Sequence, residues 1–214
     1  MAMHDTHSPY GAVVYESGVA KRDDVATVAA LKALAATHPA HVGGNVVTVL
    51  ADGSRWSYHP TSSLTGDDLF VVTPTNASGR WLRKVGSVDL KLPIAFGTSD
   101  AAVLATLPAG ARFLLRRGYW EITADFTGGS SSAIGASSSG TGYTTKGDLH
   151  GGSSGDVAAS LTAGVRAGTI GADVAAGVLL VAGDTVRFDR ITSAFAAGSG
   201  FLHLVGELVA NAGA

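Results

Sequence analysis

The sequence predicts a mainly β protein, in which a small N-terminal unit of one helix on an antiparallel sheet precedes a jelly-roll-like β-sandwich. Segments of alternating apolar and polar residues, bounded by turn residues, recur along the chain. Only one segment, near the N-terminus, has helical spacing. Glycine is abundant, with 29 of 214 residues. Several short strands separated by turns, without a long helical period, are typical of sandwiches and jelly rolls.

The first segment, residues 1–22, is predicted to be an extended arm. It shows no sustained periodicity and contains the turn-forming sequence Ser8-Pro9-Tyr10-Gly11, followed by a short strand over residues 12–15. Terminal segments of this kind usually become ordered only against a partner. Aromatic and aliphatic side chains provide most of the contact energy in such docking. The candidate anchors to a partner are Tyr10, Val13, Val14 and Tyr15.

One amphipathic helix is predicted directly after this arm. Asp23 or Asp24 can cap its N-terminus, and apolar residues follow at near-helical spacing as far as Ala35. His38-Pro39 should end the helix, because the residue before a proline is disfavoured in the α region.

From Asn45 the apolar period changes to two, which predicts strands. The expected strands span residues 46–50, 54–58, 68–73 and 79–84, and Asp52-Gly53 is expected to form a hairpin turn. With the preceding helix, these strands make up a small α+β attachment unit over residues 23–86.

Residues 87–214 are predicted to form the jelly-roll-like sandwich. Its expected strands span residues 90–96, 112–116, 119–126, 178–181, 185–191 and 201–209. Residues 178–191 resemble a hairpin that turns at Ala182-Gly183-Asp184.

Two further features of this second domain carry predictions. Thr185, Arg187 and Asp189 alternate with apolar residues, which indicates a strand with one face in solvent. Residues 128–155 are rich in glycine and serine and are interpreted as a long loop. Such a loop is too long for a passive connection in a compact domain, so it should be mobile or lie on a partner or a symmetry mate.

The composition excludes several function classes. Charged residues make up 15% of the chain, below the roughly 25% of an average soluble protein. The formal net charge is −2 and the lysines and arginines are scattered, so we expect no nucleic-acid partner. The absence of cysteine excludes disulfides, thiol catalysis and thiolate metal sites.

The sequence also gives no sign of export or membrane insertion. The N-terminus is polar and is not expected to be a signal peptide. The longest apolar run, around residues 175–182, is much shorter than the ~20 residues of a membrane helix. We therefore expect a soluble protein without a membrane partner.

Three glycine-rich segments are candidates for enzymatic or cofactor sites. Gly151-Gly152-Ser153-Ser154-Gly155 has the G-x-S-x-G pattern of a nucleophile elbow, but no hydrophobic strand leads into the serine. Residues 140–146 and 198–200 lack both the glycine order and the βαβ context of a phosphate-binding loop. All three segments are interpreted as loops, so we expect no enzymatic activity and no cofactor.

Two pairs of histidines are candidate metal ligands. His4 with His7, and His38 with His41, have a spacing that a helix can present on one face. Zinc requires three or four ligands, and neither pair has a further ligand nearby. We therefore expect exposed loop histidines and no metal. A metal on a trimer axis, with one histidine from each subunit, is the alternative for His150 or His203.

We expect structural roles for the paired carboxylates and for the aromatic residues on strands. Asp67-Asp68 should lie in a strand and point to opposite faces, and Asp23-Asp24 should sit at a helix N-terminus. Aromatic residues on strands usually belong to the core. A carbohydrate platform is the alternative for these residues, namely Trp56, Trp81, Trp120, Tyr58 and Tyr119.

Several short motifs of the first half resemble a known module. They are residues 25–34, Asp52-Gly53, residues 58–63, Asp67-Asp68, Thr73-Pro74 and residues 79–83. In this order they resemble a small module that recurs near the N-termini of tail fibres, tail spikes and other virion proteins of tailed phages. The second half is similar to β-sandwich proteins encoded with phage head genes. That similarity rests on residues 95–100, 107–112, 132–135, 145–149 and 182–189.

The resemblance implies a structural virion protein that decorates the capsid surface as a head-fibre or decoration subunit. Its implied partners are the major capsid protein or another virion protein, and further copies of the chain in a homotrimer. It would be made in the host cytoplasm and located on the phage particle. The alternative is a short tail fibre or adaptor that binds a host-surface glycan.

Overall fold

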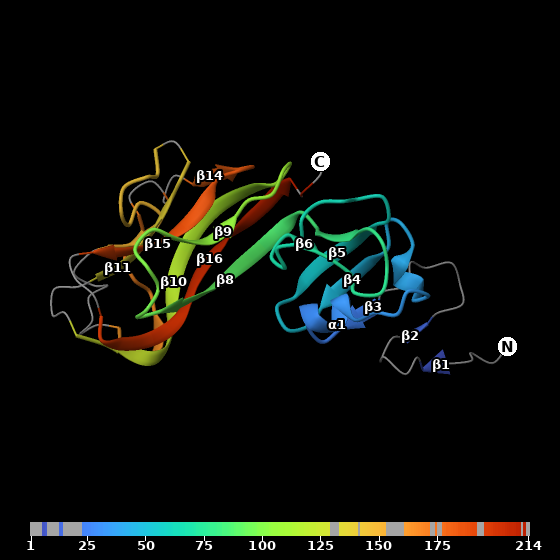
Figure 1. The fold of residues 1–214 in the computed structure, drawn as a ribbon, viewed down its shortest axis with the longest axis horizontal. Coiled ribbons are helices and arrows are strands. Elements are labelled where there is room, and N and C mark those ends of the chain that lie inside the picture. Colours follow the sequence, from blue (N-terminus) through green and yellow to red (C-terminus); the bar gives the residue numbers. More distant parts are fainter. Residues whose placement is uncertain are drawn as a thin grey trace. The chain divides into compact units, whose positions relative to one another are not determined.

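A computed structural model of the chain describes residues 6–7, 13–14, 23–128, 133–140, 142–152, 161–171, 174, 177–191, 195–210 and 212. The protein is mainly β, with several sheets and very little helix (Figure 1). The chain divides into two compact units. The first comprises Met1–Val85 with Asn211–Ala214, and the second comprises Gly86–Ala210.

The first unit contains a five-stranded sheet in the order β3-β4-β5-β7-β6. These strands are β3 (Asp23–Val25), β4 (Val46–Val49), β5 (Ser54–His59), β7 (Arg80–Arg83) and β6 (Val71–Val72). β3 pairs with β4 in parallel and the other pairs are antiparallel. The predicted strands are therefore present, although β6 is shorter than expected, and β3 was not predicted at all.

The helix of this unit differs from its prediction at both ends. α1 spans Val28–Lys32, and the Thr27 side chain caps it by accepting the Ala30 N–H at 3.2 Å. Asp23 and Asp24 are not the cap, because their main chains pair with β4. The helix ends before Pro39 is reached, because the Lys32 carbonyl accepts the N–H of Thr75 instead of a helical amide.

A buried aromatic cluster forms the core of the first unit. Trp56 and Trp81 are fully buried and Tyr58 almost so, and the apolar side of α1 adds Leu31 to the same cluster. His41, in the 3₁₀ turn η1 (Pro39–His41), has its ring 4.8 Å from Tyr58 and 5.4 Å from Trp81. Alternate residues of the strands thus supply one apolar face, as the period of two predicts.

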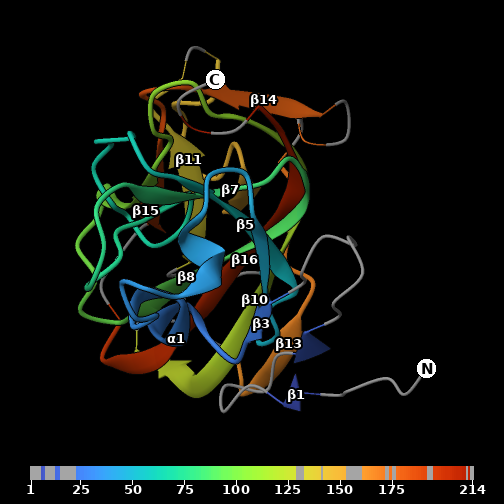
Figure 2. The ribbon, with the colours of Figure 1, turned by 90° about the vertical axis from the view of Figure 1, so that its right-hand side faces the viewer.

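The second unit contains a long antiparallel sheet, in the order β13-β10-β16-β8 with β14 also paired to β10. These strands are β13 (Gly164–Arg166), β10 (Arg112–Thr127), β16 (Ala197–Ala210), β8 (Gly86–Ala95) and β14 (Val178–Val181). Figure 2 shows β13 and β14 at opposite ends of β10.

A second sheet of this unit has the order β12-β11-β15-β9. Its strands are β12 (His150–Gly151), β11 (Ala133–Ser138), β15 (Thr185–Ile191) and β9 (Ala102–Thr106). The His150 ring of this sheet lies 4.9 Å from the ring of Trp120 in β10, so apolar faces of the two sheets meet there.

The expected hairpin over residues 178–191 is wrong. β14 pairs with β10, whereas β15 lies between β11 and β9 in the other sheet. A turn does form, with the Asp184 N–H bonded to the Val181 carbonyl, but the Asp184 carbonyl accepts the N–H of Leu107. The turn therefore carries the chain from one sheet to the other.

The interpretation of residues 128–155 as one long loop is also wrong, because β11 and β12 lie within it. Glycine serves close packing here. Gly151 has φ +76°, and a Cβ at this position would lie 2.5 Å from the Ile134 carbonyl oxygen. Gly118 makes room for the His150 ring in the same way.

Other local predictions need correction. The strands expected at 112–116 and 119–126 form the single strand β10, with a register shift between Leu115 and Arg117. Residues 198–200 belong to β16 instead of a loop. Asp189 is buried although its alternation predicted a solvent-facing position. Among the described residues, no helix has the length and apolar character needed to cross a membrane.

Candidate functional site

The outer side of the long sheet carries a connected group of polar side chains. It consists of Asp89 and Lys91 from β8, Tyr119 and Glu121 from β10, and His203 from β16; we call it the outer-face cluster. Neighbouring residues of the same strands, such as Leu90, Trp120 and Leu202, are buried on the other side. Because successive side chains alternate between the faces of a strand, the cluster lies on the side away from the core.

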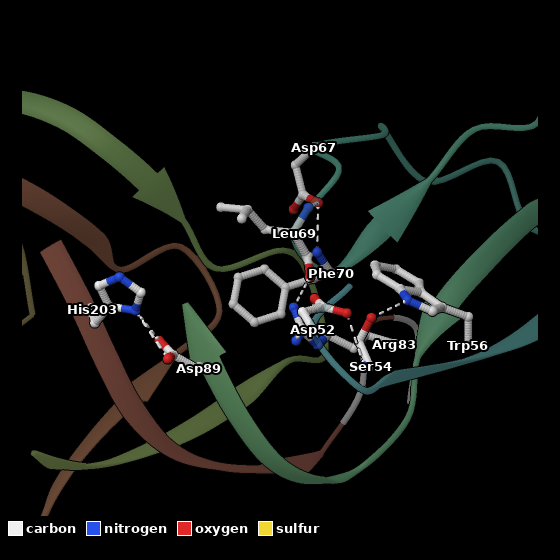
Figure 3. A network of polar contacts seen from close by, with 9 residues as sticks. All are labelled: Asp52, Ser54, Trp56, Asp67, Leu69, Phe70, Arg83, Asp89 and His203. Atoms are coloured by element: carbon white, nitrogen blue, oxygen red, sulfur yellow. Dashed lines mark hydrogen bonds and ion pairs between the residues drawn. The ribbon is translucent and has the colours of Figure 1, made fainter. Parts of the chain in front are cut away.

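His203 lies at the centre of this cluster. Its Nδ1 is 3.0 Å from both carboxylate oxygens of Asp89, and its Nε2 is 2.9 Å from Oε2 of Glu121. Figure 3 shows the imidazole turned towards Asp89. Tyr119 stacks on the imidazole, with ring centroids 4.3 Å apart and an interplanar angle of 12°. Only 8% of the His203 side chain remains exposed, so its position is fixed from three sides.

Lys91 and Tyr119 complete the network. The Lys91 ammonium lies 2.6 Å from Oε2 of Glu121 and 4.1 Å from the ring centroid of Phe201. The Tyr119 hydroxyl donates to Asp89 at 3.0 Å. Each carboxylate of the cluster therefore has a hydrogen-bond donor from another strand.

The electrostatics of the cluster follow from these contacts. Hydrogen bonds from Lys91 and then His203 hold the pKa of Glu121 below its usual value. Burial, followed by the hydrogen bond to Asp89, raises the pKa of Tyr119. Tyr119 thus stays a neutral donor, and the Glu121 carboxylate stays ionised. This arrangement holds β8, β10 and β16 together through side chains.

A second polar group is buried on the other sheet, at Asp189. Its carboxylate accepts the Ser137 hydroxyl at 2.8 Å and the Gly147 N–H at 2.9 Å, and burial raises its pKa. The adjacent Lys146 ammonium contacts Asp100 and the Arg190 carbonyl. These bonds fix the segment around Gly147 against β11 and β15.

A third network surrounds Arg83 in the first unit (Figure 3). The buried guanidinium donates to the Leu69 carbonyl at 3.1 Å, lies 3.5 Å from Asp52 and packs 5.7 Å from the Trp56 ring. Asp67 accepts three consecutive N–H groups, those of Leu69, Phe70 and Val71. Asp52, Asp67 and Arg83 therefore have structural roles in the first unit.

The predicted anchors of the arm are only partly described. Tyr10 and Tyr15 lie outside the described residues. Val13 and Val14 form β2 (Val13–Val14), which pairs with β1 (Thr6–His7). The strand expected at 12–15 is thus present over these two residues, and the anchoring role stays a prediction.

The histidines considered as metal ligands have different surroundings. His38 accepts the Ala40 N–H through Nδ1 and caps η1, and His41 packs on the aromatic core. His150 is fully buried, so its imidazole is not accessible to a metal on a symmetry axis between subunits. His4 lies outside the described residues. Within the described ranges, no three His, Cys, Asp or Glu side chains are arranged to hold a metal ion.

The paired carboxylates and the aromatics also have definite places. Asp67 and Asp68 lie in a turn before β6, not in a strand, and Asp68 forms an ion pair with Lys32. Four of the strand aromatics are buried in the core, as predicted, so they are not exposed to bind a carbohydrate. They are Trp56, Trp81, Trp120 and Tyr58. Tyr119 is partly exposed, but one face is covered by His203. Ser153 of the G-x-S-x-G pattern lies outside the described part of the chain.

Sequence reasoning missed the outer-face cluster. The alternation of Ser87, Asp89 and Lys91 with Val88 and Leu90 does signal a polar face on one strand. The partners of that face come from strands about 30 and 110 residues away, and local patterns do not encode such pairing. No family model, curated protein or solved structure matches the chain.

Proposed function

We propose that this protein is a structural subunit of a tailed-phage particle, which decorates the capsid as a head-fibre or decoration protein. The observation that carries the proposal is the outer side of the long sheet, where paired charges lie among exposed aliphatic side chains. Val165 is 69% exposed, Val209 46% and Leu179 38%. Such a face suits contact with other proteins, and the function follows from assembly contacts.

The physical reason lies in the cost of burying charge. An isolated charge loses its hydration when a partner covers it, and that loss opposes association. The carboxylates of the outer-face cluster already have donors within the subunit, so covering them leaves no unpaired carboxylate. Aliphatic side chains nearby gain from burial.

The resemblance to phage proteins supports the same proposal at the level of the two units. We assign the first unit as the attachment module expected at residues 23–86, and the second as the jelly-roll-like sandwich expected at residues 87–214; the units themselves divide between Val85 and Gly86. The two sheets of the second unit, which meet at His150 and Trp120, suit this assignment. The proposed partners are the major capsid protein or another virion protein, with further copies of the chain on the particle surface.

The test is attachment to particles that lack the protein. Particles purified from a phage with this gene deleted should bind the added full-length protein, as measured by co-sedimentation and cryo-electron microscopy. Removing residues 1–22, with Tyr10, Val13, Val14 and Tyr15, should leave a folded protein that no longer attaches. Normal attachment of the truncated chain would contradict the role of the arm. Failure of the full-length chain would contradict the virion role, and binding to a host glycan instead would favour the tail-fibre alternative.

A further inference from the structure

β8 is a long edge strand of the long sheet (Figure 1). All ten of its residues, Gly86–Ala95, are in register with β16 on one side. Within the described part of the chain, no strand pairs with its other side. A long edge of this kind presents a row of backbone N–H and C=O groups to which another strand can pair.

The hydrogen bonds at the end of β8 show which residues face this open side. The N–H of Phe96 donates to Gly198, towards β16. Ala95 faces the opposite way, because its N–H donates to the Thr98 hydroxyl and its carbonyl accepts the Thr98 N–H. Alternate residues of an antiparallel strand bond to the same side. Ser87, Asp89 and Lys91 therefore direct their N–H groups to the open edge.

We propose that this edge pairs with the β8 edge of a second copy of the chain, antiparallel and about a two-fold axis at Leu90. In this register Asp89 lies opposite Lys91 of the partner subunit, and Ser87 lies opposite Pro93 of the partner subunit. Every outward N–H of the three residues then finds a carbonyl, giving about six backbone hydrogen bonds. Pro93 has no N–H to lose and lies where the pairing ends.

Charge selects this register over its neighbours. Asp89 and Lys91 both lie on the outer face, so opposite charges meet twice across the axis. A shift of the axis by one residue in either direction places Asp89 opposite Asp89 of the partner subunit, or Lys91 opposite Lys91 of the partner subunit. Like charges directly opposite each other are unfavourable. The edge is thus complementary to itself in one arrangement.

Amide hydrogen exchange, followed by NMR at increasing protein concentration, tests the pairing without any substitution. The amides of Ser87, Asp89 and Lys91 should exchange at least about tenfold more slowly when the protein is concentrated, because each becomes bonded. The amides of Val88 and Leu90 are bonded within the subunit and serve as controls. Sedimentation velocity over the same concentrations should show a dimer.

Lys91→Pro, compared with Lys91→Ala, isolates the backbone contribution. Proline removes the Lys91 N–H, which bonds to nothing within the described chain, and should abolish the dimer. Alanine keeps the N–H and should retain dimers, weakened by loss of the ion pair.

A protein that stays monomeric up to about 1 mM would overturn the proposal. Lys91 and Pro93 would then be residues that prevent edge-to-edge pairing. So would an oligomer, including a trimer, in which the three amides exchange without protection, or a folded Lys91→Pro variant that dimerises normally. The proposal does not depend on the virion role, because the purified chain alone is measured.

Discussion

At the scale of single residues, the structure depends on glycines that have no room for a side chain. Gly151 combines a positive φ with a close approach to Ile134 and to the Trp120 ring. Gly183 has a similar φ of +88°, but a Cβ there would meet nothing within 4 Å. The two positions therefore separate backbone strain from steric overlap.

We predict that Gly151→Ala destabilises the protein far more than Gly183→Ala. The Gly183 change should cost about 1 kcal/mol from the unfavourable φ alone. The Gly151 change adds displacement of the packed backbone and should cost about 3 kcal/mol or more. Urea denaturation of both variants measures the free energy of unfolding. An equal decrease in both would show that the close contacts at Gly151 do not contribute to stability.

Glu121 provides a prediction on pH. Its pKa is lower in the folded chain than in the unfolded chain, so its contribution to stability is present above the unfolded value of ~4.3. That contribution is lost as the pH falls through the folded pKa. About a third of the side chain is exposed, which limits the effect to at most about 1 kcal/mol.

Glu121→Gln should therefore lower the free energy of unfolding slightly at pH 7 and have a smaller effect at pH 3. Denaturant titrations at the two pH values measure the difference. Asp125→Asn, on the same strand but outside the cluster, is the matched control. An equal effect of Glu121→Gln at both pH values would mean that its pairs with Lys91 and His203 do not contribute.

At the scale of secondary-structure elements, α1 shows how a short helix is defined by its ends. Thr27 caps the first turn, and the Lys32 carbonyl is used by Thr75. Thr27→Ala should cost about 1 kcal/mol, because the Ala30 N–H loses its acceptor, whereas Thr27→Ser should be nearly neutral. Thermal unfolding monitored by tryptophan fluorescence distinguishes the two variants, and equal losses would argue against the cap.

The strands were the elements best predicted from sequence. Alternation located β4, β5, β7, β8 and β15 because a half-buried strand repeats its environment every second residue. Which strands pair was not predictable. The segment 178–191 has hairpin spacing, yet tertiary contacts of Asp184 with Leu107 send its two halves into different sheets.

The polar sites were harder to predict than the strands. Asp189 follows the polar phase of β15 but is covered by the segment around Gly147. The outer-face cluster joins three strands that are far apart in sequence. In both cases the deciding contact is between distant segments. The segment that covers Asp189 is rich in glycine and serine, a composition that predicts a loop and not packed strands.

At the scale of the whole molecule, the division into two compact units predicts two unfolding events. Trp81 is fully buried in the first unit and Trp120 in the second. Calorimetry should resolve two transitions, and Trp81→Ala should lower only one of them, by removing a core side chain worth about 3–5 kcal/mol. A single transition whose calorimetric and van't Hoff enthalpies agree would show that the units unfold together.

The proposed β8 pairing limits how copies of the chain can assemble. A two-fold contact uses the β8 edge of both copies, so it closes on itself and leaves no free β8 edge for a third copy. Any three-fold arrangement of the chain would then need another surface, such as the aliphatic residues Val165 and Val209.

The closely packed glycines Gly147 and Gly151, at and just before β12, have a practical consequence for labelling the protein. A segment rich in glycine and serine is the usual first choice for inserting an affinity tag or a fluorophore. A Cβ added at Gly147 or Gly151 would lie less than 3 Å from a neighbouring backbone oxygen, so an inserted peptide would displace the chain packed against β11. The hairpin tip at Gly53, where a Cβ would meet nothing within 4 Å, is the better insertion point.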